Sequence, residues 1–85
     1  MFLHVGQEIS ILLKDIIAII DFDTVSLSKS TEEFLKTAED EGFVINLTGK
    51  PNSFIVTLDK VYISPISSTT LLKRAKALPN AQFDI

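Results

Sequence analysis

The basic side chains near the end of the chain are the ones whose type and spacing point to binding chemistry. Lys73, Arg74 and Lys76 fall in the last turns of a predicted helix. Cations at that end of a helix complement its dipole, which is a sufficient structural reason for them. The functional alternative is contact with phosphate, which needs only a positive charge in the right place. Lys14 at a strand edge and Lys50 in a turn would extend such a surface.

Two other kinds of residue deserve weighing as sites. His4 is the only histidine, but a metal needs several convergent ligands and acid–base catalysis needs a positioned partner, and neither accompanies it. We therefore interpret His4 as a structural or interface histidine. Asp21 and Asp23 lack the further oxygen ligands and the glycine of a calcium loop, so we interpret them as residues of a turn at the end of a strand.

An acidic group marks the first predicted helix and consists of Glu32, Glu33, Glu39, Asp40 and Glu41. The first two suit the positive end of the helix dipole, whereas the last three oppose it and serve either solvation or a partner. A solvated face is the simpler interpretation. Because no nucleophile–base pair, metal set or phosphate loop is present, we predict a protein that is not an enzyme and that needs no cofactor.

The amount of apolar sequence is large for the length. Eighty-five residues predict one domain, 1–85. A domain of this size has a thin core, yet 46% of its residues are hydrophobic. We expect part of this surface to be buried between subunits of a homo-oligomer, because obligate interfaces resemble a core cut in half. The alternative is an unusually well-filled monomer.

Charge and terminal sequence bear on partners and location. The net charge of −3 argues against non-specific affinity for nucleic acid. No cysteine is present, which suits a reducing compartment. The first residues lack the basic and apolar regions of a signal peptide, and the longest apolar run, residues 16–20, is far shorter than a membrane span. We expect a cytoplasmic protein with no membrane contact.

The hydrophobic pattern predicts an α+β fold. Alternation or β-branched composition predicts short strands at residues 2–5, 8–13, 16–20, 43–47, 54–58 and 61–64. The unbroken run at 16–20 suits a strand covered on both faces, and a partner subunit is needed if helices cover only one.

Two helices complete the prediction. The first begins at a capping box, Ser30-Thr31-Glu32-Glu33, and ends at Gly42, after a turn-like stretch at 21–28. The second is capped by Ser67 or Ser68 and is stopped by Pro79-Asn80, with 81–85 as a loose tail. We therefore expect a small antiparallel or mixed sheet of five to six short strands with two helices.

Taken as a whole, the sequence resembles the RemA/RemB family of small bacterial regulators of extracellular-matrix (biofilm) genes, and it is closer to the RemB branch. Four segments carry the likeness: Phe-Leu-His-Val-Gly at 2–6, Lys-Asp-Ile-Ile-Ala-Ile-Ile-Asp at 14–21, Glu-Phe-Leu-Lys at 33–36, and Lys-Val-Tyr-Ile-Ser-Pro-Ile-Ser-Ser-Thr-Thr-Leu-Leu-Lys-Arg-Ala at 60–75. The Tyr-Ile-Ser-Pro-Ile-Ser-Ser segment is the most specific of them.

The resemblance implies a DNA-binding transcriptional regulator that acts as a ring-shaped homo-oligomer on double-stranded DNA. In the RemA branch, arginines near the junction of the second and third strands and in the mid-chain hairpin turn contact DNA. In the turn, Lys50 matches one basic position and Pro51 replaces the next. At the junction, Lys14 is basic, and Asp15 occupies the position where RemA-like chains place arginine. We expect Lys14 and Lys50 to contact DNA, and we add Lys73 and Arg74 from the last helix.

The alternative is an interaction module of the same family that has lost its DNA contacts and works through other regulatory proteins. Three features favour it: Asp15 beside Lys14, Pro51 after Lys50, and the acidic net charge. Salt dependence separates the two, because phosphate contacts weaken with salt and a hydrophobic assembly does not.

Overall fold

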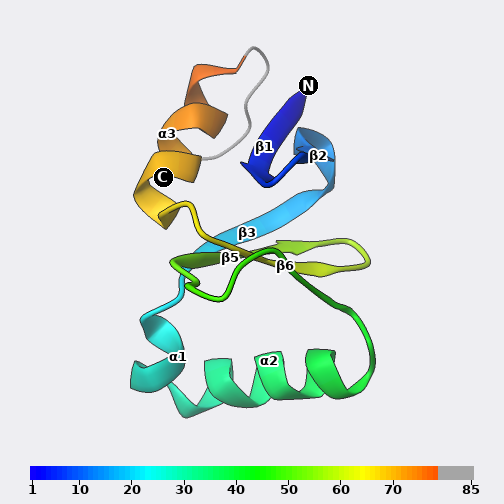
Figure 1. Cartoon of the computed structure of the whole chain (residues 1–85), viewed down its shortest axis with the longest axis vertical. Coiled ribbons are helices and arrows are strands. Elements are labelled where there is room, and N and C mark those ends of the chain that lie inside the picture. Colours follow the sequence, from blue (N-terminus) through cyan, green and yellow to red (C-terminus); the bar gives the residue numbers. More distant parts are fainter. Residues whose placement is uncertain (79–85) are drawn as a thin grey trace.

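The structure is a computed structural model that describes residues 1–78, so the expected stop at Pro79-Asn80 and the expected tail at 81–85 lie outside the described residues. Six strands, one 3-10 turn and three helices follow one another along the chain (Figure 1). In chain order they are β1 (Phe2–Gly6), β2 (Ile9–Leu12), η1 (Leu13–Asp15), β3 (Ile16–Asp21), α1 (Thr24–Leu27), α2 (Lys29–Asp40), β4 (Val44–Asn46), β5 (Ser53–Thr57), β6 (Val61–Ser64) and α3 (Ser68–Ala77).

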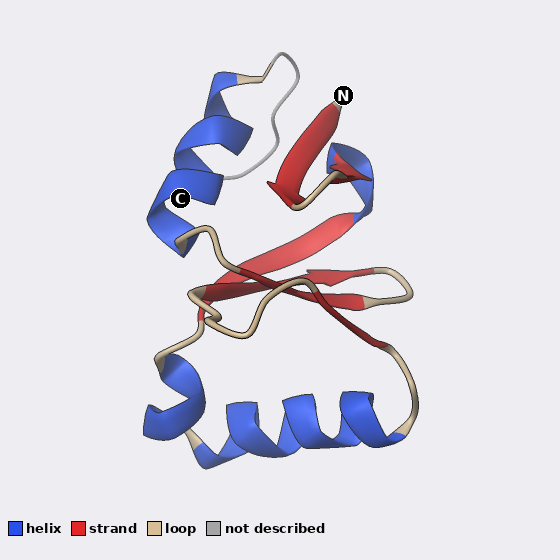
Figure 2. Ribbon diagram, viewed as in Figure 1, coloured by secondary structure: helices blue, strands red, loops and turns tan. Residues whose placement is uncertain are grey.

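A four-stranded sheet in the order β3-β5-β6-β4 forms the middle of the molecule. β5 runs antiparallel to both neighbours, whereas β4 pairs with β6 in parallel, so the sheet is mixed. β1 and β2 form a separate antiparallel hairpin. This hairpin and α3 lie on one side of the central sheet, and α1 and α2 lie on the other (Figures 1 and 2).

Alternation along the strands fills a core on each side of the sheet. In β5, Ile55 joins a cluster with the hairpin and α3, whereas its neighbour Phe54 joins a second cluster with α2. Both side chains are fully buried. Successive residues of a strand point to opposite faces, so one apolar strand can serve both cores. The ring of Phe22 meets that of Phe54 edge-on at 6.3 Å between centroids.

The predicted α+β class and the six strands are confirmed, but the strands form two sheets rather than the single sheet expected. Two details of the helices were also wrong. The stretch 21–28 was expected to be a turn and contains α1, so there are three helices rather than two. The capping box expected at Ser30 does not begin α2. That helix is capped by Ser28, whose hydroxyl accepts the Thr31 N–H. Gly42 ends it as predicted, with φ +79°.

The turn at 49–52 was expected to close a hairpin, and this expectation was wrong. β4 and β5 are not neighbours, because β6 lies between them. The chain therefore crosses from one edge of the sheet to its middle. Asn52 donates its main-chain N–H to Ser64 O and its side-chain N–H to Pro65 O, which holds the turn against the approach to α3.

Both faces of the β3 strand are covered by the chain itself, so a partner subunit is not needed there. Ile19 packs in the cluster under α3, and Ile20 packs in the cluster over α2. Apolar surface nevertheless remains. The exposed large hydrophobic residues are Met1, Phe2, Ile17, Leu27, Phe34, Phe43, Ile45 and Leu58. They lie on the strand edges, turns and helix rims that the fold does not cover.

Gly6 has a backbone conformation that favours glycine and a close neighbour that leaves no room for a side chain, so its substitution gives a stability prediction. Its φ is +137°, and a Cβ there would lie 2.9 Å from Pro65 Cδ. We expect Gly6→Ala to lower the free energy of unfolding by about 1–3 kcal/mol through strain and overpacking. Gly49→Ala is the matched control, because its Cβ would meet nothing within 4 Å. Urea titration of both variants is the measurement, and equal losses would contradict the assignment.

The position of the α2 cap yields a second prediction. We expect Ser28→Ala to destabilise the protein by about 1 kcal/mol, because the Thr31 N–H loses its acceptor. Ser30→Ala should change stability by less than about 0.5 kcal/mol, as an exposed substitution inside a helix. Thermal denaturation followed by circular dichroism compares the two. A larger loss of stability for Ser30→Ala than for Ser28→Ala would contradict this assignment and support the capping box predicted at Ser30.

Candidate nucleic-acid interface

Lys50 lies on a turn whose conformation is set by short-range hydrogen bonds. Its own N–H donates to Thr48 Oγ1 at 2.9 Å, and two residues later Asn52 binds Ser64 and Pro65 across the sheet end. The side chain of Lys50 is exposed. The turn therefore presents a lysine at a fixed place, at the end of the sheet where the chain enters α3.

The helix α3 begins at the same end of the sheet and carries two of the predicted cations. Ser67 caps it by accepting the Thr70 N–H at 3.1 Å, as one of the two expected caps. Leu71 and Ala75 are fully buried under the helix, which leaves Lys73 and Arg74 on its exposed side. Lys73 follows the cap by six residues, or about 9 Å of helix rise. The Lys50 turn and the start of α3 thus lie at the same end of the sheet.

Lys14 lies at the opposite end of the sheet. It belongs to η1, and the neighbouring Asp15 accepts the Leu58 N–H at 3.2 Å, next to the turn between β5 and β6. The five residues of β5 separate this end from the Lys50 end, a span of roughly 13 Å. One subunit therefore places the Lys50 turn and the start of α3 at one end of the sheet and Lys14 at the other.

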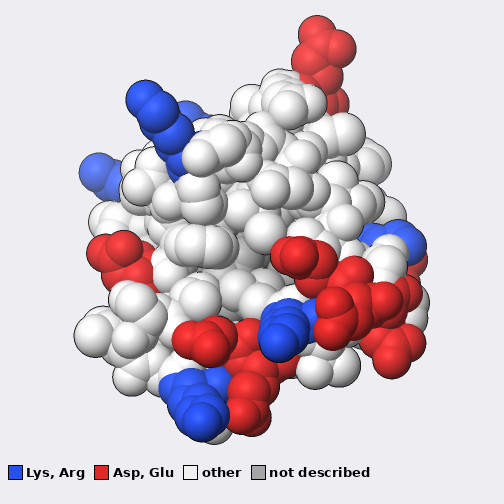
Figure 3. All heavy atoms as spheres, turned by 60° about the horizontal axis from the view of Figure 1, so that its bottom comes forward, with Lys and Arg blue, Asp and Glu red and all other residues white. Residues whose placement is uncertain are grey.

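Charge is divided between the two sides of the sheet. The stretch 66–78, which contains α3, has three cations and no acidic residue. The stretch 21–41, which contains α1 and α2, has seven acidic residues and two lysines. Figure 3 shows the side of the molecule that carries α1 and α2, where acidic side chains predominate. The small net charge of the chain thus conceals a basic side and an acidic side.

The residues weighed as acid–base or metal sites have local structural partners. The His4 ring nitrogen lies 2.8 Å from Gln7 O, across the β1–β2 turn. Asp21 Oδ1 accepts the Asp23 N–H, and the Thr24 hydroxyl donates to Asp21 O, which confirms these aspartates as residues of a strand-end turn. Within residues 1–78, no group of three or more His, Cys, Asp or Glu side chains could hold a metal ion.

The attachment of the Lys50 turn to the segment before α3 depends on two serines that were not predicted as functional residues. Ser53 and Ser64 are fully buried, and their hydroxyls donate to Ile66 O and Val5 O respectively. The Ser64 hydroxyl also accepts the Ile66 N–H. These bonds fasten the segment before α3 to β5, β6 and β1. The sequence did offer a sign of this attachment, because a serine hydroxyl at the end of a strand can form hydrogen bonds with main-chain groups of a neighbouring segment.

Comparison with known proteins identifies the family of this chain. Residues 2–75 match the RemA-like family, described as extracellular matrix regulatory protein A-like. The chain belongs to this family, as its resemblance predicted. It is 40% identical over 76 residues to the extracellular matrix regulatory protein B of Bacillus subtilis (strain 168), a match that covers 89% of this chain and 91% of that protein. Among the described residues, no helix has the length and apolar character needed to cross a membrane.

Proposed function

We propose that this protein is a DNA-binding transcriptional regulator of extracellular-matrix genes, and that it contacts the DNA backbone from a homo-oligomeric ring in the cytoplasm. Lys50, Lys73 and Arg74 form the contact surface of each subunit, and Lys14 adds a contact from the other end of the sheet. Membership of a family of extracellular matrix regulatory proteins supports the regulatory part of this proposal.

The separation of charge is the observation that carries the proposal of DNA binding. The molecule extends 34 × 23 × 22 Å, whereas the Debye length at physiological ionic strength is about 8 Å. A duplex at the α3 side therefore responds mainly to the nearby cations, and the acidic α2 side is largely screened from it. The negative net charge, which argued against DNA binding from composition alone, is thus compatible with a basic contact surface.

The start of α3 adds to this surface. The positive end of a helix dipole attracts anions, and phosphates are common ligands of helix N-termini. Ser67 and Thr69 are exposed there, close to the turn that carries Lys50. Contacts of this kind reach the backbone rather than base edges, so they favour DNA by position and shape more than by sequence.

A ring explains how so few cations per subunit can suffice. Linking several weak sites can raise affinity by roughly 10² to 10⁴ through effective concentration, provided that the copies reach one duplex together. The exposed apolar residues on strand edges and turns supply surface for subunit contacts. Sedimentation should then give a mass that is a whole-number multiple of the 9.4 kDa chain.

Substitution of the turn lysine tests the DNA contact. We expect Lys50→Ala to weaken binding to all duplexes alike and to flatten the plot of log K against log salt by about one unit per lost contact. Fluorescence anisotropy with an A·T-rich duplex at about 50 and about 200 mM salt covers the range in which phosphate contacts weaken most.

The matched control is Lys36→Ala, which removes the same charge from the acidic side of the molecule, on α2. We expect it to leave DNA binding unchanged. Equal effects of Lys36→Ala and Lys50→Ala would show a response to net charge and contradict the assigned surface. A wild-type oligomer that binds no duplex even at the lower salt would contradict DNA binding itself and favour the interaction module.

A further inference from the structure

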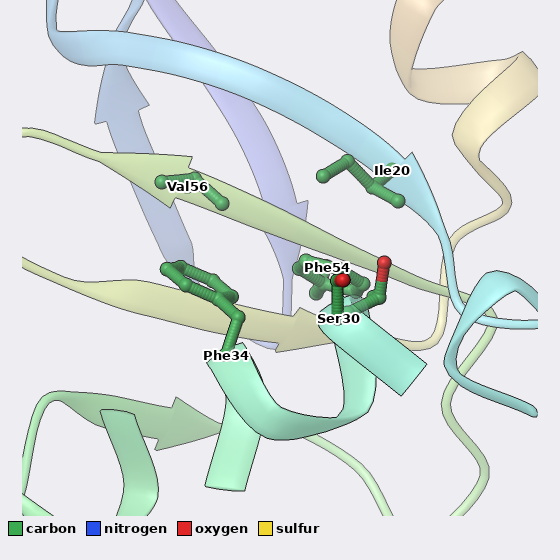
Figure 4. A pocket seen from close by; sticks show the side chains of 6 residues that line it. Ile20, Ser30, Phe34, Phe54 and Val56 are labelled. Atoms are coloured by element: carbon green, nitrogen blue, oxygen red, sulfur yellow. The ribbon is translucent and has the colours of Figure 1, made fainter. Parts of the chain in front are cut away.

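An apolar groove lies on the acidic side of the sheet, away from the proposed DNA contacts. It has a volume of about 330 Å³ and lies between the first half of α2 and the strands β3 and β5 (Figure 4). Its lining residues are Ile20, Ser30, Thr31, Phe34, Phe54 and Val56. The space is sufficient for one or two apolar side chains, and only the two hydroxyl residues of α2 give it polarity.

Phe34 forms a wall of this groove and remains 44% exposed. The sequence assigned it to the buried stripe of the helix with Leu35 and Ala38, both of which are buried. Phe34 lies one position away from that stripe, toward the groove. A half-exposed aromatic wall beside a fully buried Phe54 is a surface that an apolar side chain could complete.

The strand beside the groove has a free edge. Among the described strands, β3 pairs only with β5. It contains neither lysine nor proline, the residues that usually protect an edge from further pairing. A bulge between Ile16 and Ala18 leaves Ile17 outside the ladder and 61% exposed. The regular portion that follows, residues 18–21, offers an edge about 13 Å long to another extended segment.

The charges around the groove are predominantly acidic, although Lys29 precedes Ser30 and Lys36 lies one helical turn after Glu33. Asp21 and Asp23 follow Ile20, Glu33 precedes Phe34, and all three side chains are exposed. Glu33 lies one helical turn from Ser30, on the same face of α2 as the groove wall. A nucleic acid is therefore disfavoured here, and a cationic protein segment is favoured.

We propose that the groove and the free edge of β3 together bind an extended protein segment with apolar side chains and flanking Lys or Arg residues. The segment adds a strand to β3, places alternate apolar side chains against Phe34, Ile20 and Val56, and sets its cations near Asp21, Asp23 and Glu33. Strand addition supplies main-chain hydrogen bonds, and a pocket for alternate side chains supplies selectivity. This site is independent of DNA binding and lies on the opposite side of the sheet from α3.

Three synthetic peptides test the chemistry of the occupant. The first is fluorescein-labelled Lys-Lys-Val-Thr-Val-Thr-Val-Lys-Lys, the second replaces every Lys by Glu, and the third replaces both Thr by Pro, which cannot donate to a strand edge. Anisotropy with the intact protein should show binding of the first peptide alone, and its affinity should fall as salt is raised.

Paired variants locate the site. We expect Phe34→Ala to weaken binding of the basic peptide by about tenfold, as a central aromatic contact does. Phe43→Ala is the matched control, since Phe43 is similarly exposed at 48% but precedes β4 at the other edge of the sheet. Glu33→Lys should weaken binding, whereas Glu8→Lys in the β1–β2 turn should not. Circular dichroism confirms that each variant is folded.

Each remaining outcome overturns the proposal. Absence of peptide binding, equal binding of the acidic or proline peptide, or equal effects of Phe34→Ala and Phe43→Ala would each exclude this occupant. If Phe34→Ala instead dissociates the protein into smaller species during sedimentation while Phe43→Ala does not, the groove is a contact between copies of this chain. Displacement of the peptide by duplex DNA would place nucleic acid there instead.

Discussion

The two-sided strand β5 is the constraint on which the rest of the structure depends. It pairs with β3 and β6, and its adjacent residues Phe54 and Ile55 are each fully buried in a different core. A shift of register by one residue would exchange these side chains between the two cores. The sheet can hold α2 on one side and α3 on the other only while this register is kept.

Hydroxyl groups at both ends of β5 support that register. Ser53 donates to Ile66 O at 2.6 Å, and Thr57 donates to Lys60 O at 2.9 Å. The first bond fixes the entry to α3 beside the Lys50 turn, and the second fixes the β5–β6 turn, whose Leu58 meets η1. The position of each predicted cation is therefore set by the strand that separates them. This is why the Lys50 turn lies at the end of the sheet where α3 begins, whereas Lys14 lies at the other end.

Local patterns predicted the elements well, because alternation, caps and stop signals act within a few residues. The six strands, the Ser67 cap and the Gly42 stop all depend on such short-range chemistry. The four-residue helix α1 was missed because it is too short to show the repeated apolar spacing by which a helix is recognised in a sequence. Ser28 was missed as the cap of α2 because Ser30 offers the same chemistry two residues later.

The arrangement of β4 beside β6 depends on pairing between distant segments, which local patterns do not encode. The groove was missed for a related reason, since only the placement of α2 against β3 shows that Phe34 is left half exposed.

The arrangement of charge also restricts the symmetry of a useful assembly. If neighbouring copies repeat head to tail around one axis and α3 points along that axis, every α3 surface faces the same way, and several Lys50 turns can meet one duplex. A two-fold axis in the plane of such a ring would turn half of the α3 surfaces to the other side, so each duplex would meet fewer of them. Because the gain from linked sites requires simultaneous contact, cyclic symmetry gives the stronger binding from the same cations. In that arrangement the acidic α2 sides share a direction away from the DNA, and the groove beside β3 stays accessible to a cationic protein segment while DNA is bound.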